Sequence, residues 1–244
     1  MVPDTLIALD HQVFAAIHQF YGLSWAVDSL IWLISTNPLF KGVVSAMMFW
    51  WLWFRPHPQL SLVRSKLSAL LLLSVVAIFL GRLLALQLPF RDRPFMHPEL
   101  IRWSDDKLSS IHLDGWSSMP SDHAVMYFAL ATGYMIIDRK VGTLALLHAA
   151  LVISLTRVYN GVHFPGDILV GALLGVAAAL LLMQPLQKAL LVAGHAIGAV
   201  DLSSRRPELF YPLMFLVTLQ FATMFETARG FVGSIGEILF AVLS

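Results

Sequence analysis

Long apolar runs recur along this chain and restrict it to helical membrane architectures. Hydrophobic residues make up 58% of the 244 residues, whereas charged residues make up only 13%. A helix needs about 20 apolar residues to cross a bilayer. Backbone polar groups in lipid must be bonded within the protein, which favours helices over open sheets. We therefore predict an all-α, polytopic membrane bundle of about six transmembrane helices.

Hydropathy places the predicted crossings at six segments: Pro38–Phe54, Leu67–Phe90, His123–Ile137, Val141–Arg157, Phe164–Pro185 and Glu208–Glu226. Asp28 and the pair Asn37-Pro38 interrupt the apolar run before the first of these. Val13–Thr36 is therefore predicted to be interfacial helical material, with an extra short crossing within Ser24–Thr36 as the alternative. The tail Phe231–Leu243 is too short to cross.

Composition excludes several other classes of protein. The chain has no cysteine, which rules out disulfides and thiolate metal sites, and its net charge of +1 gives no reason to expect nucleic-acid binding. The first twenty residues carry no Lys or Arg and are interrupted by Asp4 and Asp10, so no signal peptide is predicted. No internal repeat or linker stands out, and we predict one integral membrane domain over residues 1–244.

The basic residues indicate how the bundle is oriented. One set of alternate connections contains eight of the 16 Lys and Arg residues: Arg55, Arg64, Lys66, Arg139, Lys140, Lys188, Arg205 and Arg206. The opposite side has Lys41 and then one long loop with Arg91, Arg93, Arg102 and Lys107. The positive-inside rule makes the first side cytoplasmic and this loop extracytoplasmic.

Three short polar stretches lie at the predicted extracytoplasmic face. They are RDRP at Arg91–Pro94, PSDH at Pro120–His123 and TRVYNGVHFPGD at Thr156–Asp167. Ionisable groups at membrane depth are functional candidates. Arginine forks match phosphate oxygens, and histidine moves protons near neutral pH. The combination predicts phosphoryl-transfer chemistry at this face.

These stretches resemble the motifs of the type 2 phosphatidic acid phosphatases, a family of membrane lipid phosphate phosphatases. The family's first motif ends in Arg-Pro, and its second reads Pro-Ser-Gly-His. Its third motif contains Ser-Arg, His and Asp at the spacing of Thr156-Arg157, His163 and Asp167 here. The resemblance covers about residues 67–174, the predicted catalytic half, with a weaker likeness in LDHQVFAAIHQFYG near the N-terminus.

The resemblance implies an enzyme that hydrolyses a lipid phosphate or pyrophosphate through a phosphohistidine, without metal or cofactor. His163 is then the nucleophile, Asp167 orients it, and His123 serves as acid and base. The implied phosphate-binding residues are Arg93, Arg157, Ser121, Asp122, Arg91 and Arg82. The enzyme would act on an isoprenyl pyrophosphate or a phospholipid phosphate at the outer surface of a bacterial inner membrane, with that lipid phosphate and membrane lipids as its partners.

This sequence departs from the family pattern at three positions. The family's first motif opens with Lys seven positions before Arg93, where this chain has Leu86. Arg82, one helical turn earlier, and Arg91 are both candidates for the missing cation. Asp122 stands in place of Gly, at a helix start where Asp is favoured, and Thr156 stands in place of Ser.

Several alternatives stay open at this stage. His123, His163 and Asp167 form a plausible metal-ligand set, although the arginines around them favour an anion. A phosphotransferase would use the same histidine, and a non-catalytic transport or scaffold protein would keep only the fold. Candidate lipids are undecaprenyl pyrophosphate, phosphatidylglycerol phosphate, phosphatidate and lipid A phosphate. The other seven histidines match no motif, and the sequence does not indicate an oligomeric state.

Overall fold

The computed structural model describes residues 4–101, 116–196 and 202–224, and all its regular elements are helical. In chain order they are α1 (Asp4–His18), α2 (Trp25–Thr36), η1 (Leu39–Val43), α3 (Val44–Phe54), α4 (Leu60–Gln87), η2 (Pro94–Met96), α6 (Asp122–Ile137), α7 (Arg139–Leu147), η3 (His148–Ser154), α8 (Leu155–Tyr159), α9 (Pro165–Ala196), α10 (Leu202–Arg205) and α11 (Pro207–Ala222). Over these residues the predicted all-α class is confirmed. Arg102, Lys107 and the tail Phe231–Leu243 lie outside the described residues.

Three helical segments are long and apolar enough to cross a membrane: Leu60–Gln87, Arg139–Tyr159 and Pro165–Gly194. A fourth candidate arises if α2 and the segment Leu39–Phe54 form one span bent by 64°. The bend falls at Asn37-Pro38, where proline interrupts the helical hydrogen bonds. The described residues thus hold three or four candidate spans where six were predicted. The other two predictions match α6 and α11, each only 16 residues long.

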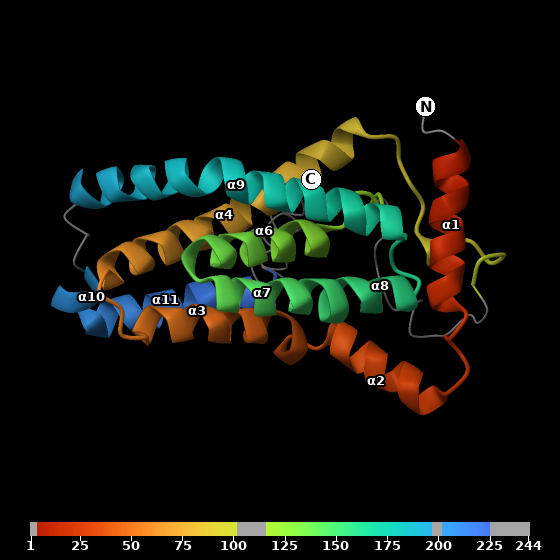
Figure 1. Ribbon diagram of the computed structural model, residues 1–244, viewed down its shortest axis with the longest axis horizontal. Helices are drawn as coiled ribbons and strands as arrows, with labels where there is room; N and C mark the ends of the chain where they lie inside the picture. Colours follow the sequence, from red (N-terminus) through yellow and green to blue (C-terminus); the bar gives the residue numbers. More distant parts are fainter. Residues whose placement is uncertain (1–3, 102–115, 197–201, 225–244) are drawn as a thin grey trace, which may run out of the picture.

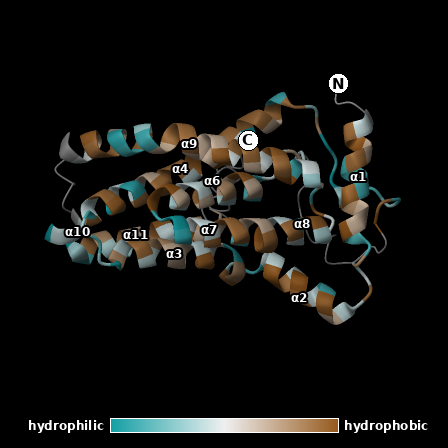
Figure 2. Cartoon of the chain, in the orientation of Figure 1, coloured by the Kyte–Doolittle hydropathy of each residue, from teal (hydrophilic) through white to brown (hydrophobic). Residues whose placement is uncertain are grey.

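The long helices carry their apolar side chains largely on the outside of the bundle. Only 39% of the most apolar window of Leu60–Gln87 is buried, and 33% of that of Pro165–Gly194. Figure 2 shows hydrophobic residues along most of both helices. A soluble monomer rarely exposes apolar patches of this extent, so these surfaces fit contact with lipid.

α6 lies at the centre of the bundle, against α4, α7 and α9, which run beside it in Figure 1. Glycine permits a close approach of α9 to α6. A Cβ atom at Gly175 would lie 2.3 Å from the carbonyl oxygen of Val125, and one at Gly171 would lie 2.8 Å from that of Ser121. These two glycines therefore let the N-terminal parts of α6 and α9 pack closely together.

α1 crosses the end of the bundle where α6 and α9 begin (Figure 1). It contacts α8 and α9, and Phe14 is fully buried against Val158 and Phe164. The Nδ1 atom of His18 lies 2.8 Å from the carbonyl oxygen of Tyr159. The predicted interfacial segment Val13–Thr36 therefore corresponds to parts of two separate helices, and the first is packed onto the end that carries the motifs.

Candidate active site

The fold brings the three motif stretches together through backbone hydrogen bonds. The N–H of Phe95 donates to Gly161 across 3.0 Å, and the N–H of Ser118 donates to Arg91 across 2.8 Å. The N–H of Ser121 donates to the carbonyl of Asp167 across 3.1 Å. The segment after α4, the start of α6 and the loop between α8 and α9 thus form one cluster at one end of the bundle.

His163 lies at the centre of this cluster and is 4% exposed. Its Nε2 atom lies 3.1 Å from a terminal nitrogen of Arg93, and its Nδ1 atom lies 3.3 Å from the hydroxyl of Ser118 and 3.5 Å from a carboxylate oxygen of Asp167. A guanidinium can only donate, so Nε2 must accept and Nδ1 must carry the proton. This tautomer leaves the Nε2 lone pair facing Arg93.

Asp167 is the fully buried third residue of α9 and is held from several directions. One carboxylate oxygen accepts the backbone N–H of Phe164 across 2.8 Å and the hydroxyl of Ser118; the other accepts Arg91 across 2.8 Å. The bond to Phe164 is the reach-back half of a capping box, which Asp167 makes because the helix begins at Pro165. α9 begins at Pro165, one residue into the predicted crossing Phe164–Pro185, and this start places Asp167 beside His163.

Burial controls the protonation of His163. It lowers the imidazole pKa from its ordinary value of 6.5 to about 4, opposed by the hydrogen bond to Asp167 and assisted by the charge of Arg93. The ring is therefore neutral near pH 7. A neutral imidazole has the lone pair that a nucleophile needs.

His123 is the second residue of α6, and its Nε2 atom is hydrogen-bonded by a terminal nitrogen of Arg157 from α8. Since arginine only donates, this nitrogen also accepts.

Some polar atoms of the neighbouring residues lack a hydrogen-bond partner in the described part of the chain. Among the described residues, no partner is found for three buried polar atoms: Nε of Arg93, Nε of Arg157 and Oγ of Ser121. Leaving such a group unsatisfied costs about 1–3 kcal/mol, so this cluster favours an acceptor-rich anion.

The two candidates for the missing lysine both bind carboxylates. Arg82 donates to Asp122 across 2.6 Å and lies over the ring of Trp116, 4.9 Å from its centroid. Arg91 binds both Asp167 and Asp10. Leu86, at the position of the family lysine, is 79% exposed. This chain therefore has Leu86 and Asp122 where the family pattern has Lys and Gly, and Asp122 forms an ion pair with Arg82 at the start of α6.

Two residues of the cluster were missed by the sequence reasoning. Ser118 contacts both His163 and Asp167, and its signal was its position just before the PSDH motif. Asp10 binds Arg91 from α1. In the sequence it is only an acidic residue among the first twenty and part of the weak N-terminal likeness, because nothing in its spacing links it to residues far along the chain.

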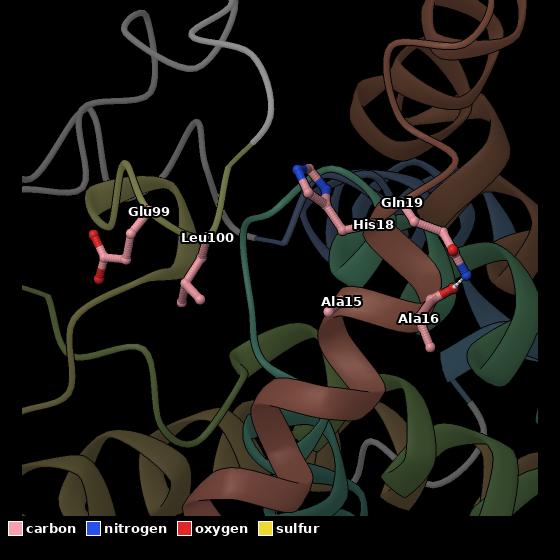
Figure 3. A pocket seen from close by; sticks show the side chains of 6 residues that line it. All are labelled: Ala15, Ala16, His18, Gln19, Glu99 and Leu100. Carbon is pink, nitrogen blue, oxygen red and sulfur yellow. Dashed lines mark hydrogen bonds between the residues drawn. The ribbon is translucent and has the colours of Figure 1, made fainter.

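Two other features of the described residues concern binding. No group of three or more His, Asp or Glu side chains in them is arranged to hold a metal ion. A pocket of about 520 Å³ lies between α1 and the turn after η2, lined by Ala15, Ala16, His18, Gln19, Glu99 and Leu100 (Figure 3). None of these six is a predicted site residue, so this pocket is distinct from the histidine cluster.

The fold and the site thus describe a helical bundle with candidate membrane spans and a buried cluster of His, Arg and Asp side chains at one end. The chain belongs to the PAP2 superfamily, whose family profile matches residues 69–190, half of the chain. Arg93, His123, Arg157, His163 and Asp167 all fall within the match.

Three individual proteins are also similar to this chain in sequence or structure. The chain is 30% identical over 158 residues to the Escherichia coli (strain K12) protein named "Putative undecaprenyl-diphosphatase YbjG", covering 63% of this chain and 73% of that protein. It is 39% identical over 64 residues to "Bacitracin transport permease protein BcrC" of Bacillus licheniformis, a match that spans 26% of this chain and only 31% of that relative. The crystal structure of Aquifex aeolicus LpxE is 23% identical, with a TM-score of 0.48, over 72% of this chain and 95% of that one.

Proposed function

We propose that this protein hydrolyses the pyrophosphate or phosphate of a membrane lipid through a phosphohistidine on His163, without a metal ion. One observation carries the proposal: the His163 imidazole lies between Asp167 and Arg93, with its Nε2 lone pair on the side of Arg93. A cation beside the attacking atom brings an anionic phosphate to the place where the attack occurs.

In the proposed first step, the phosphate binds between Arg93 and Arg157, which turn their N–H groups from the imidazoles to its oxygens. His123, released from Arg157, takes up a proton at Nε2. The Nε2 atom of His163 then forms the N–P bond while the P–O bond to the lipid breaks, and His123 gives its proton to the departing oxygen. Asp167 and Ser118 hold the Nδ1–H and stabilise the cationic ring.

In the second step, water attacks the phosphorus and the N–P bond breaks. His123 accepts the proton of the water, and inorganic phosphate leaves while His163 returns to its neutral form. The hydroxyl of Ser121 and the first N–H groups of α6 are suited to bind the remaining phosphate oxygen. We assign Arg82, held by Asp122, to the edge of the phosphate site, and Arg91 to the support of Asp167.

The substrate we favour is an isoprenyl pyrophosphate, supported by the name of the Escherichia coli relative and by the number of arginines near His163. Its polar head lies at the bilayer surface. We further propose that α6 and α11 complete six crossings of a bacterial inner membrane with the cluster on the extracytoplasmic side. The excess of Lys and Arg on the opposite connections supports this orientation.

The test is release of inorganic phosphate by purified full-length protein in detergent with EDTA present. Undecaprenyl pyrophosphate, phosphatidylglycerol phosphate and phosphatidate are offered in parallel. We expect release from the pyrophosphate, and a loss of about 10³-fold or more in His163→Ala together with loss of an acid-labile phosphoenzyme. His97→Ala is the matched control, because His97 is a part-exposed histidine that bonds Glu99 outside the cluster. Activity that survives in His163→Ala, or that EDTA abolishes, contradicts the proposal.

A further inference from the structure

Asp10 on α1 contacts the candidate active site from outside the family match, which begins at residue 69. Its side chain is 12% exposed. One carboxylate oxygen accepts the backbone N–H of Gly166 across 2.7 Å, and the other forms an ion pair with Arg91. Both partners lead to Asp167: Arg91 donates to it across 2.8 Å, and Gly166 precedes it in the chain. Asp10 is thus connected through Arg91 to the Asp167 carboxylate that faces His163.

The position of Asp10 is fixed by packing on either side of it. The ring of His11 stacks on Phe164 with 5.1 Å between centroids, and Phe14 is fully buried one turn further along α1. A Cβ atom at Gly166 would lie 2.9 Å from a carboxylate oxygen of Asp10, so the absence of a side chain there allows this approach. α1 therefore presents Asp10 to the first turn of α9 in a defined orientation.

The charge arrangement shows what Asp10 does for its neighbours. The guanidinium of Arg91 is shared between two carboxylates and lies over the ring of Phe164, 4.3 Å from its centroid. Without Asp10, one end of this guanidinium would lose its partner. It would then turn toward the bound phosphate or take both oxygens of Asp167. Either change would alter how Arg91 holds the Asp167 carboxylate that faces the Nδ1–H of His163.

We propose that Asp10 is a positioning residue of the active site, which holds Arg91 and Gly166 so that Asp167 keeps the His163 ring in its reactive orientation. This inference rests on the proposed function for its kinetic consequences. In this proposal α1, which precedes the region matched to the family, contributes a positioning residue to the active site.

The kinetic test compares Asp10→Asn, Arg91→Gln and the double variant in the full-length protein with undecaprenyl pyrophosphate. Asparagine can still accept the Gly166 N–H, so Asp10→Asn isolates the ion pair with Arg91. We expect kcat to fall roughly 10-fold to 100-fold with KM within about 3-fold, because orientation rather than binding is lost. The double variant should match Arg91→Gln, and Asp10→Glu should restore part of kcat.

Asp28→Asn is the matched control. Asp28 is also a buried acid near the N-terminus that accepts a backbone N–H, from Gly22 across 3.0 Å, but its other partner is the hydroxyl of Tyr159. We expect it to lower the melting temperature without the loss of kcat. The proposal is overturned if Asp10→Asn keeps kcat within about 2-fold, if its effect multiplies with that of Arg91→Gln, or if Asp28→Asn loses kcat equally at the same stability.

A spectroscopic measurement decides the question independently of turnover. In protein labelled with ¹⁵N-histidine, the His163 resonances are identified by their loss in His163→Gln. Asp10→Asn should shift these resonances, and Asp28→Asn should leave them in place. If wild-type protein releases no phosphate from any lipid, the proposed function fails, while the resonance shift still reports whether Asp10 positions His163. Unchanged resonances in Asp10→Asn would overturn the positioning role.

Discussion

The two sides of His163 are built differently. On the Nδ1 side, the Asp167 carboxylate accepts hydrogen bonds from the backbone N–H of Phe164, the hydroxyl of Ser118 and the guanidinium of Arg91, and it faces the His163 ring. Arg93 lies on the Nε2 side, and three polar atoms of the cluster, Nε of Arg93, Nε of Arg157 and the hydroxyl oxygen of Ser121, are buried with no partner found among the described residues. The chain thus saturates the side that orients the nucleophile with its own groups. It leaves donors on the side where a phosphate would bind.

Both sets of residues are assembled from several segments. Asp167 and its cap residue Phe164 belong to the start of α9, whereas Ser118 precedes α6 and Arg91 follows α4. Arg93, Ser121 and Arg157 come from the segment before η2, the start of α6, and α8. What differs is that the groups orienting the nucleophile are bonded within the protein, whereas the second set keeps donors that a bound ligand can use.

The largest loss of kcat is expected from replacing Asp167, which orients the His163 ring. Asp167→Asn removes the charge that stabilises the cationic ring and favours the wrong tautomer of His163. We expect kcat to fall about 10³-fold to 10⁴-fold, as for a triad aspartate. Phosphate release under saturating substrate measures it.

Asp138→Asn is the control for this variant, because Asp138 caps α7 and pairs with Arg55 rather than with any residue of the cluster. It should keep full kcat. Asp167→Asn protein that remains folded and retains a tenth of wild-type kcat would show that the carboxylate does not orient the nucleophile.

A smaller effect is expected on the binding side. Arg157→Lys keeps the charge but replaces a planar fork that reaches His123 with a single ammonium. We expect kcat/KM to fall roughly 10-fold to 100-fold. Arg64→Lys is the matched control, since Arg64 bonds the carbonyl of Trp53 and lies over that ring, away from the cluster. Equal values for the two variants would remove Arg157 from the proposed phosphate site.

Much of the cluster could be predicted because its residues lie in short local patterns. Arg93, His123, Arg157, His163 and Asp167 fall in three stretches whose spacing is visible in the sequence, and the structure brings all of them together. Their catalytic roles stay proposals. The helix start at Pro165 was also predictable, because proline at a first helical position and an acidic third residue mark a helix N-terminus.

The parts that could not be predicted depend on contacts between distant segments. Asp10 meets Arg91 only because α1 folds across the end of the bundle, and no local pattern encodes that contact. The carboxylate partners of Arg82 and Arg91 were missed for the same reason. Hydropathy placed a crossing at His123–Ile137, but it could not show that this helix, α6, is surrounded by its neighbours.

The pH dependence of stability separates the effect of burial on the pKa of His163 from the effect of its bond to Asp167. Above about pH 6.5, His163 is neutral in both folded and unfolded protein. Between pH 6.5 and the folded-state pKa of about 4, the unfolded chain takes up a proton that the buried ring resists. The free energy of unfolding should therefore fall as the pH falls, by up to about 1.4 kcal/mol per pH unit from this group. His163→Gln lacks this contribution, and the other histidines titrate in both proteins. Melting temperatures in detergent from pH 7 to pH 5 should fall more steeply for wild type, whereas parallel curves would show that Asp167 and not burial dominates the pKa of His163.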